Sequence, residues 1–185
     1  VLATVIVTRS RRSTQELELA ALSDPLTELL NLRGFKAAIQ QRWPDEFISH
    51  SAVLQLDMDY LKRLNDSLGH AVGDKAIVCV AEAIRKSARD GEGDIAARIG
   101  GDEFVVIVVS KVPLEAARRV ARRVVEQLAG VTSIDDMPVS LRISFGISCA
   151  VEPTPIEEVL RAADNDMLTA KSTRAAVVPQ DSALS

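Results

Sequence analysis

The sequence predicts an α+β fold in which helices pack over a central sheet that includes an antiparallel hairpin. Three observations indicate this class. Residues 139–149 alternate apolar and polar side chains with a period of two, which is typical of a strand with one buried face. Two apolar runs, 96–99 and 104–109, flank a turn of two glycines and two acids, which is the signal of a β-hairpin. Apolar residues at helical spacing mark helices over 76–88 and 114–128.

Composition places the chain among globular proteins. It has 185 residues, of which 47% are hydrophobic and 26% charged, so a disordered, collagen-like or disulfide-stapled chain is excluded. Only 3% are aromatic and the net charge is −4, which argues against a nucleic-acid partner. Cys79 and Cys149 lie in apolar runs without metal-ligand spacing and are interpreted as small buried residues in a reducing compartment.

The N-terminal residues suggest a membrane connection. Residues 1–7 are apolar and are followed by Arg9, Arg11 and Arg12, as at the end of a membrane helix with a positive cytoplasmic flank. Seven residues are too few to cross a bilayer, which takes about 20, and a frayed tail is the alternative reading. We expect residues 1–23 to hold the end of a membrane segment and a connecting helix over 14–23, with a cytoplasmic domain of an inner-membrane protein following.

The first elements of that domain are indicated by capping signals. Asp24 followed by proline predicts a helix N-cap with proline at the first helical position. Asn31 predicts the cap of a further helix that continues through Trp43. Residues 52–59 predict a short buried strand that ends in two carboxylates on one face.

The later elements follow from turns and periodicity. A loop around 65–69 leads to the helix that continues through about residue 88, and the hairpin turn is expected to use the access of glycine to positive φ. The helix over 114–128 carries an arginine-rich face, which we interpret as solvated. Thr154 predicts the N-cap of a last helix that reaches about Lys171, and residues 177–185 predict a short strand and a loose tail.

Acidic residues gather at three turns. Asp57 and Asp59 end a strand, Asp102 and Glu103 occupy the hairpin turn, and Asp74 stands between a glycine and a lysine. Carboxylates on neighbouring turns suit Mg²⁺, which takes one or two of them and leaves its other positions to water and phosphate oxygens. Taken singly, each cluster is better explained as ordinary turn acids. Adjacent residues face opposite ways on a regular strand, so Asp102 and Glu103 share a site only if the turn twists.

The pattern as a whole resembles the GGDEF family of diguanylate cyclases. Residues 98–104 read Arg-Ile-Gly-Gly-Asp-Glu-Phe, which resembles the RxGGDEF signature, and residues 57–74 resemble DxDxFKxxNDxxGHxxGD. Further blocks in family order lie at 24–27 (DxLT), 31–35 (NRRxF), 144–148 (SFGIS) and 163–171 (the closing block). The resemblance covers about residues 24–178, which are assigned to a GGDEF domain, and residues 179–185 are assigned to a flexible tail.

This resemblance implies a fold and a reaction. The fold is palm-like, as in class III nucleotide cyclases, with a mainly antiparallel sheet of about five strands wrapped by helices. The reaction condenses two GTP into cyclic di-GMP and two pyrophosphates. Each domain of a homodimer holds one GTP, and the 3′-hydroxyl of one attacks the α-phosphate of the other. An upstream sensor and membrane segment are expected to control the pairing.

The resemblance also assigns residues. Asp57 and Asp102 correspond to ligands of Mg²⁺, or of Mn²⁺, with help from the main-chain carbonyl of Met58. Glu103 corresponds to a further metal ligand or to the base for the 3′-hydroxyl. Gly100 and Gly101 would let the backbone approach the phosphates closely.

The remaining assignments concern the nucleotide. Asn65 and Asp74 correspond to the groups that read guanine, because a carboxylate accepts from donors that adenine lacks. Lys62 and Lys171, together with Arg174, correspond to the cations that meet the β- and γ-phosphates.

Several positions depart from the family pattern. Leu168 replaces a tyrosine of the closing block, residues 172–174 lack its glycine, and Gly91 stands where the product-inhibition motif RxxD has arginine. Weak product inhibition is therefore expected. The leading hypothesis is an active diguanylate cyclase, and the alternative is a catalytically degenerate GGDEF module that binds GTP or a protein partner.

Overall fold

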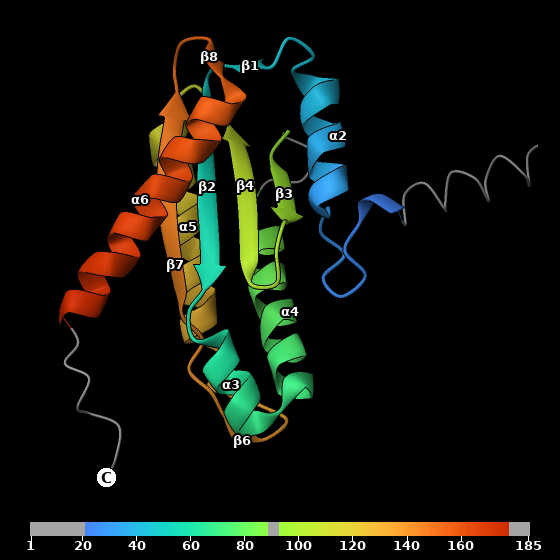
Figure 1. Ribbon diagram of the computed structural model, residues 1–185, viewed down its shortest axis with the longest axis vertical. Coiled ribbons are helices and arrows are strands. Elements are labelled where there is room, and N and C mark those ends of the chain that lie inside the picture. Colours follow the sequence, from blue (N-terminus) through green and yellow to red (C-terminus); the bar gives the residue numbers. More distant parts are fainter. Residues whose placement is uncertain (1–20, 89–92, 178–185) are drawn as a thin grey trace, which may run out of the picture.

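The computed structural model describes residues 21–88 and 93–177, with side chains up to Thr173 (Figure 1). The expectations for residues 1–20 and 179–185 lie outside the described residues. Within the described ranges, no helix has both the length and the apolar composition that a membrane span requires. The elements are, in order, α2 (Leu32–Arg42), β1 (Phe47–Ile48), β2 (Ser51–Met58), α3 (Leu61–Leu68), α4 (His70–Ser87), β3 (Ile95–Arg98), β4 (Glu103–Val109), α5 (Pro113–Ala129), β5 (Ser133–Ile134), β6 (Met137–Pro138), β7 (Ile143–Ala150), β8 (Thr154–Pro155) and α6 (Ile156–Val177).

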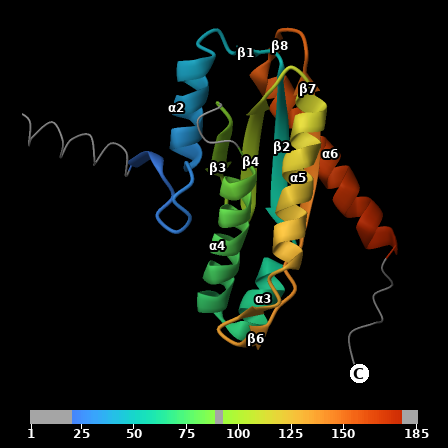
Figure 2. The ribbon, with the colours of Figure 1, turned by 180° about the vertical axis from the view of Figure 1, so that it is seen from behind.

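The principal sheet has the strand order β3-β4-β2-β7, and all its neighbouring strands are antiparallel. Helices α2 and α6 lie on one face of this sheet, and α4 and α5 cover the other (Figures 1 and 2). The predicted α+β class with a mainly antiparallel sheet is confirmed. The sheet contains four strands within the described residues, and β1 with β8 and β5 with β6 form separate two-stranded pairs.

Each face of the sheet has its own apolar core. Leu54 and Leu56 of β2 pack with α4 and α5, whereas Val53 packs with α2 and α6. Because both faces are covered, β2 and β4 are almost continuously apolar instead of alternating. The alternation of side chains then places the odd-numbered residues of β2, Asp57 included, on the face that α6 covers.

The segment before α2 differs from the prediction. Asn31 caps α2 as expected, with its side chain accepting a bond from the Gly34 N–H at 2.9 Å. The helix predicted to begin at Asp24 is wrong. Asp24 Oδ1 accepts from the Thr27 N–H at 2.9 Å and closes one isolated turn. Glu28 then adopts a positive φ of 60°, and this left-handed residue takes the chain away from a helical path.

Two more predicted boundaries are wrong. The stretch 65–69, expected as a loop, belongs largely to α3, because Leu61, Leu64 and Leu68 pack against the core at helical spacing. Thr154 does not cap α6. Its hydroxyl donates to the Glu152 carbonyl at 2.9 Å while its backbone pairs with β1.

The end of the domain differs as well. Strand β7 begins at Ile143 instead of residue 139, because residues 137–138 pair with β5 and the Val139 N–H donates to the Thr132 carbonyl. Helix α6 continues beyond Lys171 to Val177, because no glycine follows Lys171 to end it. The strand expected from residue 177 is not seen at Val177, which belongs to α6, and the rest of that stretch lies outside the described residues. Cys149 is exposed on edge strand β7, so its predicted burial is wrong, and Cys79 is half-buried.

Candidate active site

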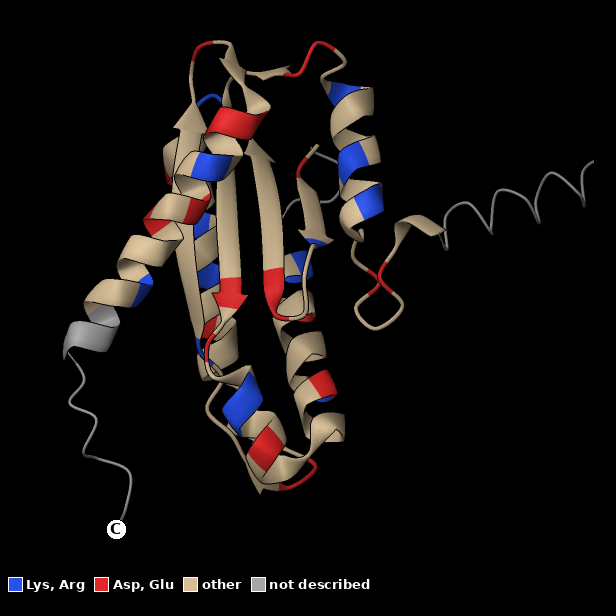
Figure 3. Ribbon diagram, viewed as in Figure 1, with Lys and Arg blue, Asp and Glu red and all other residues tan. Residues whose placement is uncertain are grey.

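Acidic residues meet at one end of the sheet, where β2 ends and β4 begins (Figure 3). Asp57 pairs directly with Glu103 of β4 on one side and with Ser144 of β7 on the other. Directly paired residues of antiparallel strands project from the same face. Asp57, Glu103 and Ser144 therefore form a row on the face that α6 covers. Asp102 lies in the hairpin turn, and its carbonyl accepts from the Met58 N–H at 3.0 Å.

A cavity of about 360 Å³ opens at this end of the sheet. Five of the residues assigned from the sequence line it: Asp57, Met58, Lys62, Asp102 and Lys171. They come from the end of β2, from α3, from the hairpin turn and from α6, which are far apart in the chain. With Asp59, which also lines the cavity, the fold thus gathers three carboxylates and two ammonium groups around one space.

Asp57 is the most constrained of these groups. Its side chain is 13% exposed, and Lys171 Nζ lies 2.6 Å from its Oδ1. Burial raises the pKa of the Asp57 carboxyl above its usual 3.8, and the Asp102 charge adds to this, although the hydrogen bond and charge of Lys171 act in the opposite direction. Asp57 is therefore a sheltered carboxylate whose direct charge partner is the Lys171 ammonium group.

The lining of the cavity fits a divalent cation that arrives with a phosphate ligand. Mg²⁺ binds through one or two carboxylates and completes its shell with water and phosphate oxygens. Asp57 and Asp102 supply two carboxylates at the cavity, and Met58 borders it. Within the described part of the chain, no three His, Cys, Asp or Glu side chains converge as a self-sufficient metal site.

Glu103 lies beside this cavity without lining it. Its carboxylate packs against Gly100, where an added Cβ would lie 2.4 Å from Glu103 Oε2. A side chain at position 100 would therefore displace the Glu103 carboxylate. The expected positive φ in the hairpin turn is wrong, because Gly69 and Gly93 are the glycines with positive φ in the described segments. At Gly101 an added Cβ would meet no atom within 4 Å.

The turn from β2 into α3 supplies a feature that the sequence analysis missed. Tyr60 adopts the left-handed conformation, with φ 62°, and α3 begins at Leu61 without a side-chain cap. The first N–H groups of an uncapped helix are available to an anion. Tyr60, Leu61 and Lys62 all line the cavity. The spacing of the leucines in 61–68 was the available signal for this helix.

The two residues assigned to guanine lie outside the cavity, at the junction of α3 and α4. Asn65 Oδ1 is buried and has no hydrogen-bond partner. It lies so close to Gly73 that an added Cβ there would be 1.8 Å away. Asp74 is the next residue and is exposed. A buried oxygen without a donor is costly, so Asn65 Oδ1 is an unsatisfied acceptor close to Asp74. Arg174 belongs to α6, but its side chain lies outside the described residues.

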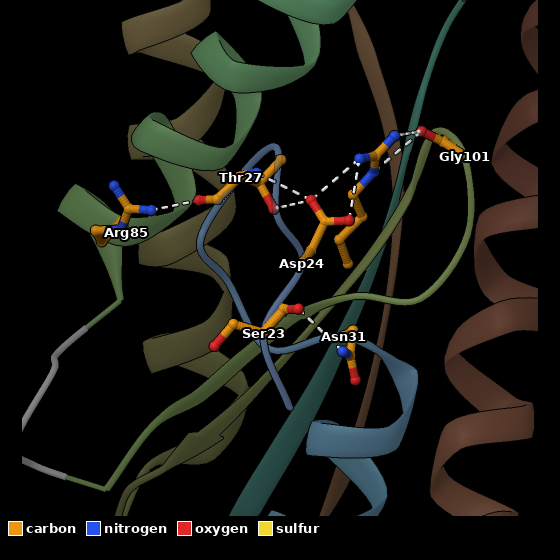
Figure 4. A network of polar contacts seen from close by, with 7 residues as sticks. Ser23, Asp24, Thr27, Asn31, Arg85 and Gly101 are labelled. Carbon is orange, nitrogen blue, oxygen red and sulfur yellow. Dashed lines mark hydrogen bonds and ion pairs between the residues drawn. The ribbon is translucent and has the colours of Figure 1, made fainter. Parts of the chain in front are cut away.

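Arg98 links the hairpin turn to the loop before α2, and Figure 4 shows its two partners, Gly101 and Asp24. It donates to the Gly101 carbonyl at 2.7 Å and to Asp24 Oδ1 at 3.1 Å. Arg85 of α4 donates to the Thr27 carbonyl in the same loop. These contacts connect the turn that carries Asp102 to the loop before α2 and to α4. No local pattern in the sequence predicts them.

Comparison with known proteins gives consistent matches. The family described as "Diguanylate cyclase, GGDEF domain" matches residues 21–176. The probable diguanylate cyclase DgcJ of Escherichia coli is 32% identical over 155 residues, which is 83% of this chain and 30% of that protein. Diguanylate cyclase DgcP of Pseudomonas aeruginosa is 34% identical over 158 residues, 82% of this chain and 22% of that protein. The chain thus spans less than a third of these relatives.

Solved structures share the fold. The coiled coil and GGDEF domain of DgcB from Caulobacter crescentus, in complex with c-di-GMP, superposes with a TM-score of 0.72 at 26% identity. The match covers 92% of this chain and 91% of that one. The palm-like arrangement expected from the motifs is therefore confirmed.

Proposed function

Because the chain belongs to the GGDEF family of diguanylate cyclases, we propose that it condenses two GTP into cyclic di-GMP and two pyrophosphates. The observation that carries this proposal is the single cavity in which Asp57, Asp102, Lys62 and Lys171 meet. Phosphoryl transfer needs positioning and charge neutralisation more than a covalent nucleophile. Two carboxylates for a divalent cation and two ammonium groups for a triphosphate meet that need.

The nucleotide is held by groups on three elements. Lys62, Lys171 and the first N–H groups of α3 bind the β- and γ-phosphates. The base lies against the junction of α3 and α4, where Asn65 accepts a donor from guanine. Asp74 accepts from the N1–H and the exocyclic amine, which adenine does not present together.

The reaction joins two such sites. The 3′-oxygen of one GTP forms a bond to the α-phosphorus of the other, the bond to the β-phosphate oxygen breaks, and pyrophosphate leaves. Asp57 and Asp102, with the Met58 carbonyl, would hold Mg²⁺ or Mn²⁺, which supplies charge neutralisation at the triphosphate. Glu103 lies in the same row as Asp57 and accepts the 3′-hydroxyl proton or completes the metal shell.

Because one domain offers one such site, turnover requires a homodimer. We assign control of that pairing to segments outside residues 24–178, which raise the effective concentration of one domain near the other. We also propose, from the apolar and arginine residues at positions 1–12, that this is the cytoplasmic domain of an inner-membrane protein. The described residues alone are expected to pair weakly, so the specific rate rises with protein concentration.

The direct test is incubation with GTP and Mg²⁺ or Mn²⁺, followed by chromatography of the products at several protein concentrations. Cyclic di-GMP and pyrophosphate in a ratio of one to two support the proposal, as does a specific rate that increases with concentration. Intact GTP in the presence of either metal, together with tight GTP binding, would contradict it.

That contrary result would favour the second candidate, a catalytically degenerate GGDEF module that binds GTP or a protein partner. The closing block is the observation in its favour. Leu168, at the place of the family tyrosine, is 52% exposed, and α6 continues through the residues that lack the glycine. Both features alter the element that carries Lys171.

A further inference from the structure

We propose that Lys171 is a placeholder cation, whose ammonium group occupies Asp57 in the nucleotide-free protein and keeps divalent metal from binding there until the nucleotide brings it. This inference rests on the proposed function, because it assigns Lys171 a second partner, the phosphates. It concerns the order in which metal and nucleotide occupy the site.

The contact between the two residues is close and sheltered. Lys171 Nζ lies 2.6 Å from Asp57 Oδ1, and the two side chains are 33% and 13% exposed. Among the ion pairs of the described residues, only Asp24 with Arg98 is less exposed overall. An ammonium group at this distance takes one of the carboxylate oxygens that a divalent cation would use, and its charge repels that cation.

The fold, and not a flexible side chain alone, brings Lys171 to this position. Helix α6 crosses β7 at Gly146, where an added Cβ would lie 2.2 Å from both the Ala163 carbonyl oxygen and the Met167 nitrogen. Asp166 Oδ2 also accepts from the Ile147 N–H at 2.8 Å. These contacts fix the helix against the edge strand of the sheet (Figure 1).

The spacing of residues along α6 and β7 then determines where Lys171 lies along the sheet. It follows Met167 by one helical turn, about 6 Å along the axis. Ser144 precedes Gly146 by two strand residues, about 7 Å, and Ser144 pairs with Asp57. Lys171 therefore comes level with the row that contains Asp57.

The same cavity also offers a binding place for phosphates, which would be the second partner of Lys171. Lys62 and the uncapped start of α3 border the cavity together with Lys171. Asp57 would hold the metal of an entering metal–triphosphate complex, and the Lys171 ammonium group would then be released to meet the phosphate oxygens. The nucleotide-free site therefore excludes free metal but admits the metal–nucleotide complex.

The proposal predicts opposite effects of one substitution on two binding reactions. Lys171→Met should increase the affinity of the nucleotide-free protein for Mn²⁺ alone by about tenfold. The same variant should bind the Mn²⁺ complex of a non-hydrolysable GTP analogue less tightly. Both affinities are measured by calorimetry, and Mn²⁺ also by electron paramagnetic resonance, on protein whose circular dichroism matches the wild type.

Lys62→Met is the matched control, since Lys62 lines the same cavity but is not the partner of Asp57. It should weaken nucleotide binding and raise the affinity for Mn²⁺ alone by clearly less than Lys171→Met, because the Lys62 ammonium group does not occupy an oxygen of Asp57. Adding Asp57→Asn to Lys171→Met should abolish the gain in Mn²⁺ affinity. Lys171→Gln repeats the test with a polar side chain in case the methionine disturbs folding.

An unchanged or reduced Mn²⁺ affinity in both Lys171 variants would overturn the proposal, as would a gain that survives Asp57→Asn. This result is independent of turnover. If the wild type forms product but the Lys171 variants do not change Mn²⁺ binding, the placeholder role is rejected and the cyclase proposal stands. If the Lys171 variants gain Mn²⁺ affinity but the wild type forms no product, only the cyclase proposal is rejected.

Discussion

Asp24 and Arg98 form an ion pair of 3.1 Å between segments that are 74 residues apart in the chain. Both side chains are well buried, with exposures of 19% and 13%. Arg98 also holds the Gly101 carbonyl in the hairpin turn. The loop before α2 is thereby connected to the turn that carries Asp102, so the two motifs form one structural unit.

Asp24→Asn is expected to lower the free energy of unfolding at pH 7 by about 1–3 kcal/mol, because the charge-assisted bonds are lost. Burial raises the pKa of Asp24, but the hydrogen bonds from Thr27 and Arg98 outweigh it and hold the pKa below the usual 3.8. Because the pKa of Asp24 is lower in the folded state than in the unfolded state, the ionised carboxylate stabilises the fold at pH values above the unfolded-state pKa. This stabilisation is lost as the pH falls through the folded-state pKa.

The difference in the free energy of unfolding between Asp24→Asn and the wild type should therefore shrink below about pH 3.9. Urea unfolding from pH 7 to pH 3 measures this difference. Glu115→Gln is the control, because its pair with Arg118 is 3.2 Å long but exposed. It should change stability by less than about 1 kcal/mol. A gap for Asp24→Asn that stays constant with pH would exclude the ionised carboxylate as its source.

Asp102→Asn should reduce the rate of product formation by about 100-fold or more, because it removes a charge from the cavity proposed to hold the metal and the triphosphate. Thermal unfolding should remain close to wild type. Asp136→Asn serves as the control, since Asp136 is exposed in the β5–β6 turn at a positive φ that asparagine also tolerates. Near-normal turnover by Asp102→Asn would remove it from the metal site.

Asp74→Ser should reduce the preference for GTP over ATP by at least about tenfold in a competition assay, because the acceptor for the guanine donors is lost. Glu82→Ser, an exposed acid on the same helix, should leave the preference unchanged. Selectivity that is equal in the two variants would show that another group reads the base.

Gly146→Ala should destabilise the domain by about 1–3 kcal/mol, because the added Cβ would overlap the backbone of α6. It should also weaken nucleotide binding by shifting Lys171 away from the cavity that it lines. Gly130→Ala is the comparison, since its Cβ would come no closer than 3.3 Å to the Gln127 carbonyl oxygen. Equal stability of the two variants in denaturant unfolding would contradict the close crossing of α6 over β7.

Local patterns in the sequence were sufficient for much of the fold. The cap at Asn31, the apolar run of β2, the hairpin of β3 and β4 and the apolar stripe of α5 were predicted, because each depends on neighbouring residues. The predictions failed where tertiary contacts decided the outcome. The turn at Asp24 is held in place by Arg98 of β3, and Thr154 lies in a strand because β1 pairs with it.

The candidate site divides in the same way. The acids Asp57, Asp102 and Glu103 could be found from the sequence, because they lie in short motifs at the ends of predicted strands. Their arrangement required the register of β2 with β4, which places Asp57 and Glu103 on one face and leaves Asp102 in the turn. The contact of Lys171 with Asp57 depends on the crossing of α6 at Gly146. No local pattern expresses that crossing, because it results from the packing of a helix on a strand formed earlier in the chain.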